Sequence, residues 1–147
     1  MIISSWNVNS VRARIENIKE YLNKFSPDIL MMQEIKTPDE TYPYDDIKNL
    51  KYENYVFGQK SYNGVAIISK KKLDGIKNDI FKDKNKQSRI ISAEVKHKKK
   101  NITLINIIVF FLCFISAEII LDCLFLSLKI SFLIPSNFFL EIIATPL

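Results

Sequence analysis

A strand, a helix and a second strand are predicted within the first 34 residues, and this order restricts the fold more than any other feature of the sequence. Residues 2–8 and 29–32 are short apolar runs of the kind that forms buried strands. Between them, apolar residues recur at helical spacing from Val11 to Phe25, with charged residues on the other face. A strand–helix–strand unit of this length joins parallel strands. We therefore expect an α/β domain that begins with two parallel strands.

After residue 38, the helical spacing of apolar residues gives way to short segments separated by polar turns, which indicates further strands. A short helix is expected near residues 45–50, and residues 70–86 are expected to form a charged loop. Asn9 or Ser10 is expected to cap the first helix. Strands are expected at residues 52–57, 64–69, 89–96 and 101–107, separated by polar turns such as residues 97–100. This order predicts a mixed sheet with its helices on one face.

Composition divides the chain near residue 107. The net charge is +5, and 20 of the 21 Lys and Arg residues precede residue 107. Of the last 41 residues, 29 are hydrophobic, and this segment holds both cysteines. The front part is typical of a cytoplasmic domain with a basic surface, which favours an anionic partner. Two cysteines confined to one segment argue against a disulfide-stapled secreted fold.

A carboxylate and an amide follow the two predicted parallel strands. Glu34 closes the second strand and Asn7 lies at the matching end of the first, where open α/β sheets place their ligand crevices. A carboxylate there suits Mg²⁺, which takes few protein oxygens and keeps waters. Lys36 adds a cation near the same position. The alternative is that Glu34 is a solvated acid at a strand end and Asn7 a turn residue.

Two sequence blocks carry a family resemblance. Residues 5–14 (Ser-Trp-Asn-Val-Asn-Ser-Val-Arg-Ala-Arg) and 27–36 (Pro-Asp-Ile-Leu-Met-Met-Gln-Glu-Ile-Lys) resemble the opening of the exodeoxyribonuclease III-like branch of the endonuclease/exonuclease/phosphatase superfamily. Shorter matches follow at residues 58–60, 62–67, 89–91 and 101–106, so the resemblance covers most of residues 1–107.

The resemblance implies the N-terminal part of a four-layered α/β sandwich, in which two sheets pack face to face between helices, and it implies an activity. The front part would supply about one sheet, whose second face is expected to lie open or to be covered haphazardly by the apolar end of the chain. Members of the family are Mg²⁺-dependent (or Mn²⁺-dependent) phosphodiesterases that act on double-stranded DNA at 3′ ends and abasic sites in base-excision repair. By motif position, Glu34 matches the metal-binding glutamate and Asn7 the asparagine at the same centre. Arg12, Arg14 and Lys36 flank this position and are the predicted contacts to DNA phosphates.

The match stops where the later catalytic blocks of the family should begin. The expected Tyr-x-Pro-Asn block is absent after Asn106, as are the Asp-x-Asn pair, the later metal-site aspartate and the closing Ser-Asp-His block. No complete catalytic set is therefore present, because the general base, tyrosine and histidine blocks are all missing. The single histidine, His97, lies in a lysine-rich turn and is expected to be solvated there.

Residues 108–147 therefore need a separate explanation. One hypothesis is translation of the same gene in a shifted reading frame, so that residues 1–107 are a partial nuclease domain with its activity lost or weak. The alternative is a small membrane-associated protein with a degenerate, non-catalytic nuclease domain, anchored through residues 107–134. That anchor is not favoured, because Glu118 and Asp122 fall within the span and a central acid is costly in a bilayer.

Two lysine runs are a weaker indication of nucleic-acid contact. They are residues 70–72 and 96–100, the second broken only by His97. Such runs are most often solvated turns, and the alternative is contact with phosphates that does not depend on base sequence.

Overall fold

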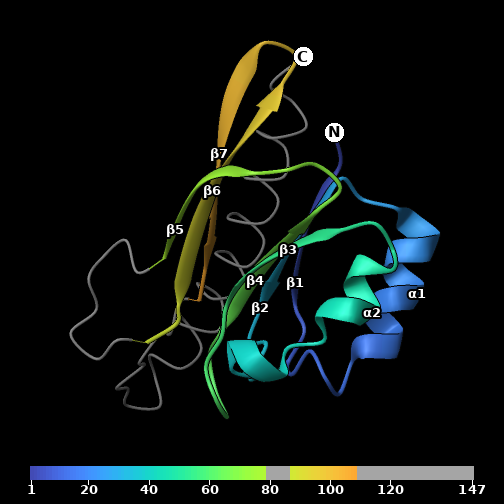
Figure 1. Cartoon of the computed structure of the whole chain (residues 1–147), viewed down its shortest axis with the longest axis vertical. Helices are drawn as coiled ribbons and strands as arrows, with labels where there is room; N and C mark the ends of the chain where they lie inside the picture. The colour runs from blue at the N-terminus through green and yellow to red at the C-terminus, as the bar shows by residue number, and fades with distance from the viewer. Residues whose placement is uncertain (79–86, 109–147) are drawn as a thin grey trace, which may run out of the picture. The chain divides into compact units, whose positions relative to one another are not determined.

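The computed structural model describes residues 1–78 and 87–108, and they form two β-sheets with helices outside the first (Figure 1). The first sheet has the order β1-β2-β4-β3 and the second β5-β6-β7. The strands of the first sheet are β1 (Ile3–Asn7), β2 (Ile29–Gln33), β3 (Glu53–Phe57) and β4 (Val65–Ser69). Those of the second are β5 (Asp74–Asn78), β6 (Ile90–His97) and β7 (Lys100–Ile107). The mixed α/β fold predicted from the sequence is confirmed.

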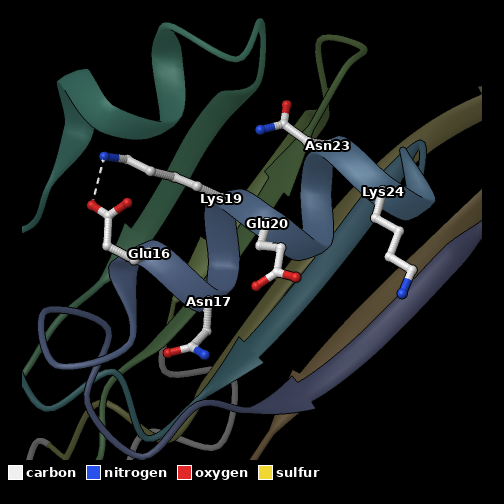
Figure 2. Close-up of a pocket in the computed structure, with 6 residues that line it drawn as sticks. All are labelled: Glu16, Asn17, Lys19, Glu20, Asn23 and Lys24. Atoms are coloured by element: carbon white, nitrogen blue, oxygen red, sulfur yellow. Dashed lines mark hydrogen bonds and ion pairs between the residues drawn. The ribbon is translucent and has the colours of Figure 1, made fainter.

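The predicted strand–helix–strand unit is present. Strands β1 and β2 are parallel, with Ile3 opposite Ile29 and Asn7 opposite Gln33. The helix between them, α1 (Ile15–Phe25), buries Ile18 and Leu22 against the first sheet. Its outer face is polar, and Figure 2 shows Lys19 beside Glu16 on that face. The spacing of apolar residues along an otherwise charged segment therefore predicted α1 correctly.

The start of α1 corrects the prediction. The helix begins at Ile15 and its N-cap position is Arg14, with no side-chain cap bond. Asn9 and Ser10, expected to cap it, both have positive φ angles. The backbone N–H of Ser10 donates to the Glu34 carbonyl at 2.8 Å. Residues 9 and 10 are thus tied to the segment after β2, and the chain needs four further residues before it turns into the helix.

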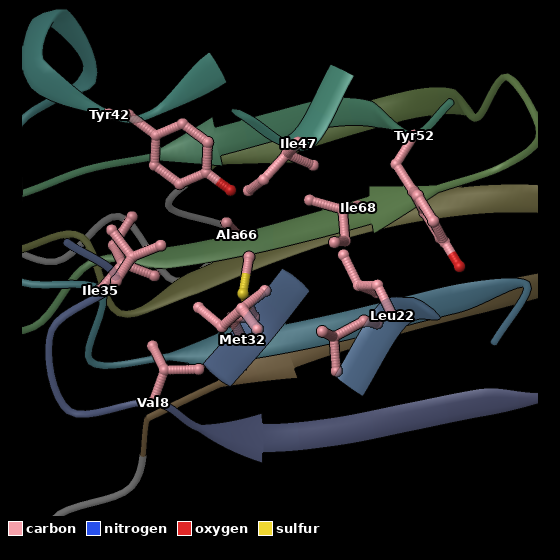
Figure 3. Packing of buried hydrophobic residues seen from close by; sticks show 12 residues of the cluster. Val8, Leu22, Met32, Ile35, Tyr42, Ile47, Tyr52, Ala66 and Ile68 are labelled. Atoms are coloured by element: carbon pink, nitrogen blue, oxygen red, sulfur yellow. The ribbon is translucent and has the colours of Figure 1, made fainter. Parts of the chain in front are cut away.

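The main core lies between the first sheet and its helices. The short helix α2 (Tyr44–Lys48), expected near residues 45–50, follows the 3-10 helix η1 (Asp39–Thr41) and contributes Ile47. Figure 3 shows Ile47 and Tyr42 above Met32 and Leu22, with Tyr52 at one side. Alternate residues of β2 point into this cluster.

The second face of the first sheet is covered, contrary to the prediction that it would lie open. Strands β6 and β7 lie against β2 and β4. Met31 and Ile67 are buried although they lie outside the helix-side cluster, and so are Ala93 and Leu104 of the second sheet. The prediction was wrong because it counted all six expected strands toward about one sheet, whereas the last two of them, together with β5, form a second layer.

Strand β5 was also missed, since residues 70–86 were expected to be a loop. All five of its residues are exposed, so no alternation of apolar and polar residues marks it. It pairs antiparallel to β6 with a register shift between Asp74 and Lys77.

The predicted turn at residues 97–100 is confirmed. It joins β6 to β7 through Lys98 and Lys99, both at positive φ as in a two-residue type I′ turn.

The proposed membrane anchor falls almost entirely outside the described residues. Within residues 1–78 and 87–108, no helix has the length and apolar character needed to cross a bilayer. The hypotheses about residues 109–147 concern positions that the structure does not describe.

Candidate functional site

Asn7 and Glu34 meet at the end of the two parallel strands. Asn7 is the last residue of β1, and Glu34 directly follows β2. The Asn7 Nδ2 donates a hydrogen bond to Glu34 Oε1 at 2.8 Å. The Asn7 Oδ1 accepts the backbone N–H of Asn9 at 3.1 Å, which fixes the orientation of the amide. The spacing of these residues in the sequence therefore translates into direct contact, and we call the pair the Asn7–Glu34 mouth.

Lys36 forms an ion pair with the second oxygen of the Glu34 carboxylate. Its Nζ is 3.1 Å from Glu34 Oε2 and 2.5 Å from Asn9 Oδ1. The hydrogen bond from Asn7 lowers the pKa of Glu34 below its ordinary value, and Lys36 lowers it further, while partial burial acts in the opposite direction. Glu34 is consequently an ionised, hydrogen-bonded carboxylate at neutral pH.

The backbone around the mouth is held in uncommon conformations. Asn9, Ser10, Glu34 and Lys36 all have φ angles between 45° and 84°. Non-glycine residues adopt this left-handed region rarely, and strained positions persist only where surrounding contacts hold them. Backbone hydrogen bonds supply those contacts, from Ser10 to Glu34 and from Val11 to Ile35.

Gly64 brings a third segment to the same place. Its carbonyl accepts the Ile35 N–H at 3.1 Å, and the neighbouring Asn63 carbonyl accepts the Lys36 N–H at 3.0 Å. Gly64 has a φ of 78°, and a Cβ there would lie 2.6 Å from Ile35 Cγ1. Only glycine allows this approach, so Gly64 is a structural part of the mouth whose role the sequence did not reveal.

A pair of amide side chains, one of them buried, joins the two sheets behind the mouth. Gln33 Nε2 donates to Asn106 Oδ1 at 2.6 Å, and Asn106 Nδ2 donates to the carbonyls of Met32 and Ala66, both at 2.9 Å. Asn106 is only 1% exposed. Both residues lie in sequence blocks that carried the family resemblance, but their contact across 73 positions gave no signal of its own.

The predicted phosphate contacts differ in how they are placed. Arg12 and Arg14 are exposed in the turn between the mouth and α1. Lys36 is already engaged with Glu34 and Asn9. His97 is the last residue of β6, at the end of this strand away from the mouth; it lies beside the expected turn and is of intermediate exposure. Its pKa is lowered by burial and then by nearby cations that include Lys71 and Lys98.

The donor set fits a hydrated divalent cation. Glu34 offers one ionised carboxylate with hard oxygen ligands, which is the type of group that Mg²⁺ binds while keeping most of its waters. Among the described residues, no group of three or more His, Cys, Asp or Glu side chains is placed to hold a metal. The fit therefore extends to a single protein carboxylate and not to a closed metal cage.

The open depression shown in Figure 2 is not this site. It has a volume of about 740 Å³ and lies along the outer face of α1. Its lining residues are Glu16, Asn17, Lys19, Glu20, Asn23 and Lys24. None of these residues was predicted to act in catalysis or binding, and the balance of acids and lysines is that of a solvated helix face.

Comparisons with known proteins agree with the fold and the sequence blocks. The sequence pattern of the Endonuclease/Exonuclease/phosphatase family matches residues 4–98. The chain is 36% identical over 103 residues to Exodeoxyribonuclease III of Haemophilus influenzae, covering 69% of this chain and 39% of that protein. It is 32% identical over 100 residues to the DNA repair nuclease APEX1 of Danio rerio, covering 64% and 32% respectively.

Solved structures give the same picture. A variant of the 3′ phosphatase NExo from Neisseria, bound to a product DNA hairpin, superposes with a TM-score of 0.65 and 32% identity, covering 73% of this chain and 40% of that one. An AP endonuclease from Archaeoglobus fulgidus superposes with a TM-score of 0.62 and 30% identity, covering 70% and 40%. The chain thus spans about two fifths or less of the length of these relatives.

Proposed function

The chain belongs to the endonuclease/exonuclease/phosphatase family, and from this membership we propose that residues 1–107 are the N-terminal portion of a Mg²⁺-dependent (or Mn²⁺-dependent) DNA phosphodiesterase. The substrate class is double-stranded DNA with abasic sites or 3′ ends. The relatives named above are DNA nucleases and a 3′ phosphatase bound to a DNA hairpin, which supports this choice. We also propose a cytoplasmic location, in keeping with the cysteine-free, basic front part.

The observation that carries the proposal is the hydrogen-bonded pair of Asn7 and Glu34 at the ends of parallel strands. Asn7 lowers the pKa of the Glu34 carboxyl and fixes one of its oxygens. In this proposal Glu34 holds the metal ion and Asn7 orients the carboxylate or a phosphate oxygen. When a divalent cation is bound there, it would neutralise the charge that develops on the phosphate and would help to align the attacking water.

The cationic side chains have separate roles. Arg12 and Arg14 project from the turn beside the mouth, where exposed guanidinium groups can pair with backbone phosphates. Lys36 occupies the second oxygen of Glu34 in the protein alone. Its ammonium group is a competitor for the carboxylate and becomes available to a phosphate when a cation takes its place.

The proposed activity of this chain alone is weak or absent. The sequence lacks the family blocks that would supply the general base, the tyrosine and the histidine. The family pattern ends at residue 98, close to the break in composition near residue 107. We propose that residues 108–147 are not part of the nuclease fold and arise from translation in a shifted frame. Sequencing the gene tests this, because another frame downstream of codon 107 should encode the missing Tyr-x-Pro-Asn and Ser-Asp-His blocks.

Metal binding by the full chain tests the proposed role of Glu34 without depending on turnover. Mn²⁺ is titrated into the protein, and free Mn²⁺ is followed by electron paramagnetic resonance. Glu34→Gln should abolish the binding seen with the wild-type chain, because it removes the carboxylate that the mouth offers to a cation. Glu20→Gln, an exposed carboxylate on α1, is the matched control and should bind as the wild type does.

Nicking of an abasic-site duplex in the presence of Mg²⁺ tests the chemistry. Any cleavage by the wild-type chain should disappear in Glu34→Gln and persist in Glu20→Gln. Equal Mn²⁺ binding and equal nicking by the wild type and Glu34→Gln would exclude the mouth as a metal site.

A further inference from the structure

Six lysines gather at the end of the two sheets that is opposite the Asn7–Glu34 mouth. Ser69, the last residue of β4, pairs with Ile29, the first residue of β2, so the chain leaves β4 at the far end from Glu34. The β6–β7 turn lies at this end too, because β6 starts next to Ser88, whose carbonyl accepts the Gly64 N–H. We call the following residues the lysine surface: Lys71, Lys72, Lys96, Lys98, Lys99 and Lys100.

The two groups of lysines are close enough to act on one residue. His97, at the end of β6, has a pKa lowered first by burial and then by neighbouring positive charges. Those charges include Lys71 from the connection after β4 and Lys98 from the β6–β7 turn. Lysines from two separate connections of the chain thus contribute to one positive region.

The charge of the lysine surface is not neutralised by the described part of the chain. All six lysines are exposed, and within residues 1–78 and 87–108 no ion pair involves them. By contrast, Lys19 pairs with Asp46, and Lys70 donates to the carbonyl and hydroxyl of Ser26 at 2.6 Å. Asp28 lies at the same end, but its carboxylate already accepts the Ile2 N–H at 2.7 Å.

The lysine surface is too far from the mouth to contact the same phosphate. Strand β6 has eight residues, and a strand rises about 3.3 Å per residue, so its two ends are about 23 Å apart. Gly64 and Ile35 lie near the first end, and Lys98 lies just beyond the second. A ligand on the lysine surface is therefore a different stretch of polymer, or a different molecule, from one held at the mouth.

We propose that the lysine surface is a second nucleic-acid contact, which binds the phosphate backbone without reading base sequence. Its lysines are spread over two connections, so they suit a polymer with repeated negative charges better than a single small anion. Residues 96–100 present no aliphatic or large aromatic side chain that would insert into a bilayer, whereas helices that bind membrane surfaces combine basic and apolar faces. This surface lies apart from the proposed metal site.

The turn itself permits a substitution that removes charge without harming the fold. Lys98 and Lys99 have φ angles of 45° and 66°, and Asn followed by Gly is the preferred pair for a type I′ turn. The double variant Lys98→Asn, Lys99→Gly therefore removes two charges and gives the turn better-suited residues. Lys48→Gln with Lys77→Gln is the matched control, since both are exposed lysines outside the lysine surface and the net charge falls by the same amount.

The experiment measures binding of the full chain to a labelled intact duplex by fluorescence anisotropy, in EDTA and over a range of salt concentrations. Lys98→Asn, Lys99→Gly should weaken binding and reduce the slope of log affinity against log salt by about 1.8, or about 0.9 for each lost phosphate contact. The control variant should keep the wild-type slope. The assay contains EDTA and therefore does not depend on metal binding, so a failure of the proposed metal site leaves this inference testable.

Three outcomes would overturn the inference. Equal weakening by the turn variant and the control would show an effect of net charge alone. An unchanged slope in the turn variant would show that Lys98 and Lys99 do not contact phosphates. Binding to phosphatidylserine vesicles that is lost in the turn variant, with duplex binding unchanged, would assign the surface to a membrane instead.

Discussion

Replacing Gly64 with alanine should destabilise the fold by more than its backbone conformation alone explains. A left-handed conformation costs a non-glycine residue about 1–2 kcal/mol. The added Cβ would also lie 2.6 Å from Ile35 Cγ1, inside van der Waals contact, and overpacking of this kind costs about 1–3 kcal/mol. We therefore expect Gly64→Ala to lower the free energy of unfolding by about 2–5 kcal/mol.

Gly75 provides the matched control. It also has a positive φ, but an added Cβ would meet only the flexible side chain of Glu94, at 3.3 Å. Gly75→Ala should thus cost only the backbone term of about 1–2 kcal/mol. Urea unfolding can be followed by the fluorescence of Trp6, the only tryptophan in the sequence. The Trp6 ring packs against the ring of Tyr21, and the two ring centroids are 5.6 Å apart.

A double-mutant cycle isolates the steric part of the effect. Ile35→Ala removes the atom that the new Cβ would strike, so Gly64→Ala should cost less in that background than in the wild type. Equal destabilisation by Gly64→Ala and Gly75→Ala, together with additive effects of the changes at Gly64 and Ile35, would refute the steric argument. The close approach of β4 to the segment that carries Glu34 would then lack the importance assigned to it.

Three other substitutions give distinct outcomes. Tyr42→Phe should raise the free energy of unfolding by about 1 kcal/mol, because the Tyr42 hydroxyl is buried and has no hydrogen-bond partner among the described residues; a lower urea midpoint would contradict this. Asn106→Leu should lower the free energy of unfolding by about 2–4 kcal/mol, because the buried carbonyls of Met32 and Ala66 lose a hydrogen-bond donor. A change within the error of the wild-type unfolding curve would show that these bonds contribute little. Glu34 has a folded pKa below its ordinary value of 4.5, so its stabilising contribution is present above about pH 4.5 and is lost as the pH falls through the folded pKa. The urea midpoint of Glu34→Gln should accordingly vary less than that of the wild type between neutral and acidic pH, and parallel profiles would contradict the assigned shift.

Sequence patterns predicted the elements that bury residues on one face or on both, and missed β5, whose residues are all exposed. The apolar stripe of α1 and the unbroken run of β2 are large signals because each residue must fit a core. Strand β5 carries no such signal, since all of its residues are exposed and its sequence is that of a polar loop. The division into two sheets was missed for a related reason. A strand's pattern shows how much of it is buried, but not which sheet it joins.

The contacts of the mouth were predictable in part. Asn7 and Glu34 end adjacent parallel strands, and parallel pairing alone places them side by side. The pairing does not predict that Glu34 and Lys36 adopt positive φ, because neither residue type favours it. Nor does it predict the capture of Glu34 by Lys36, which depends on that local backbone.

The strained backbone explains why the mouth keeps its geometry in so short a portion of the fold. Each left-handed residue costs free energy, and the backbone hydrogen bonds that hold Ser10, Glu34 and Lys36 come from within residues 7–64. The Gln33–Asn106 pair adds an anchor from β7, near the last residue that the structure describes. The carboxylate site is therefore assembled by the front part of the chain alone. By this argument Mn²⁺ binding to Glu34 and loss of turnover can coexist, because holding the ion and activating the attacking water depend on different parts of the fold. A wild-type chain that folds cooperatively but does not bind Mn²⁺ would show that this separation is wrong.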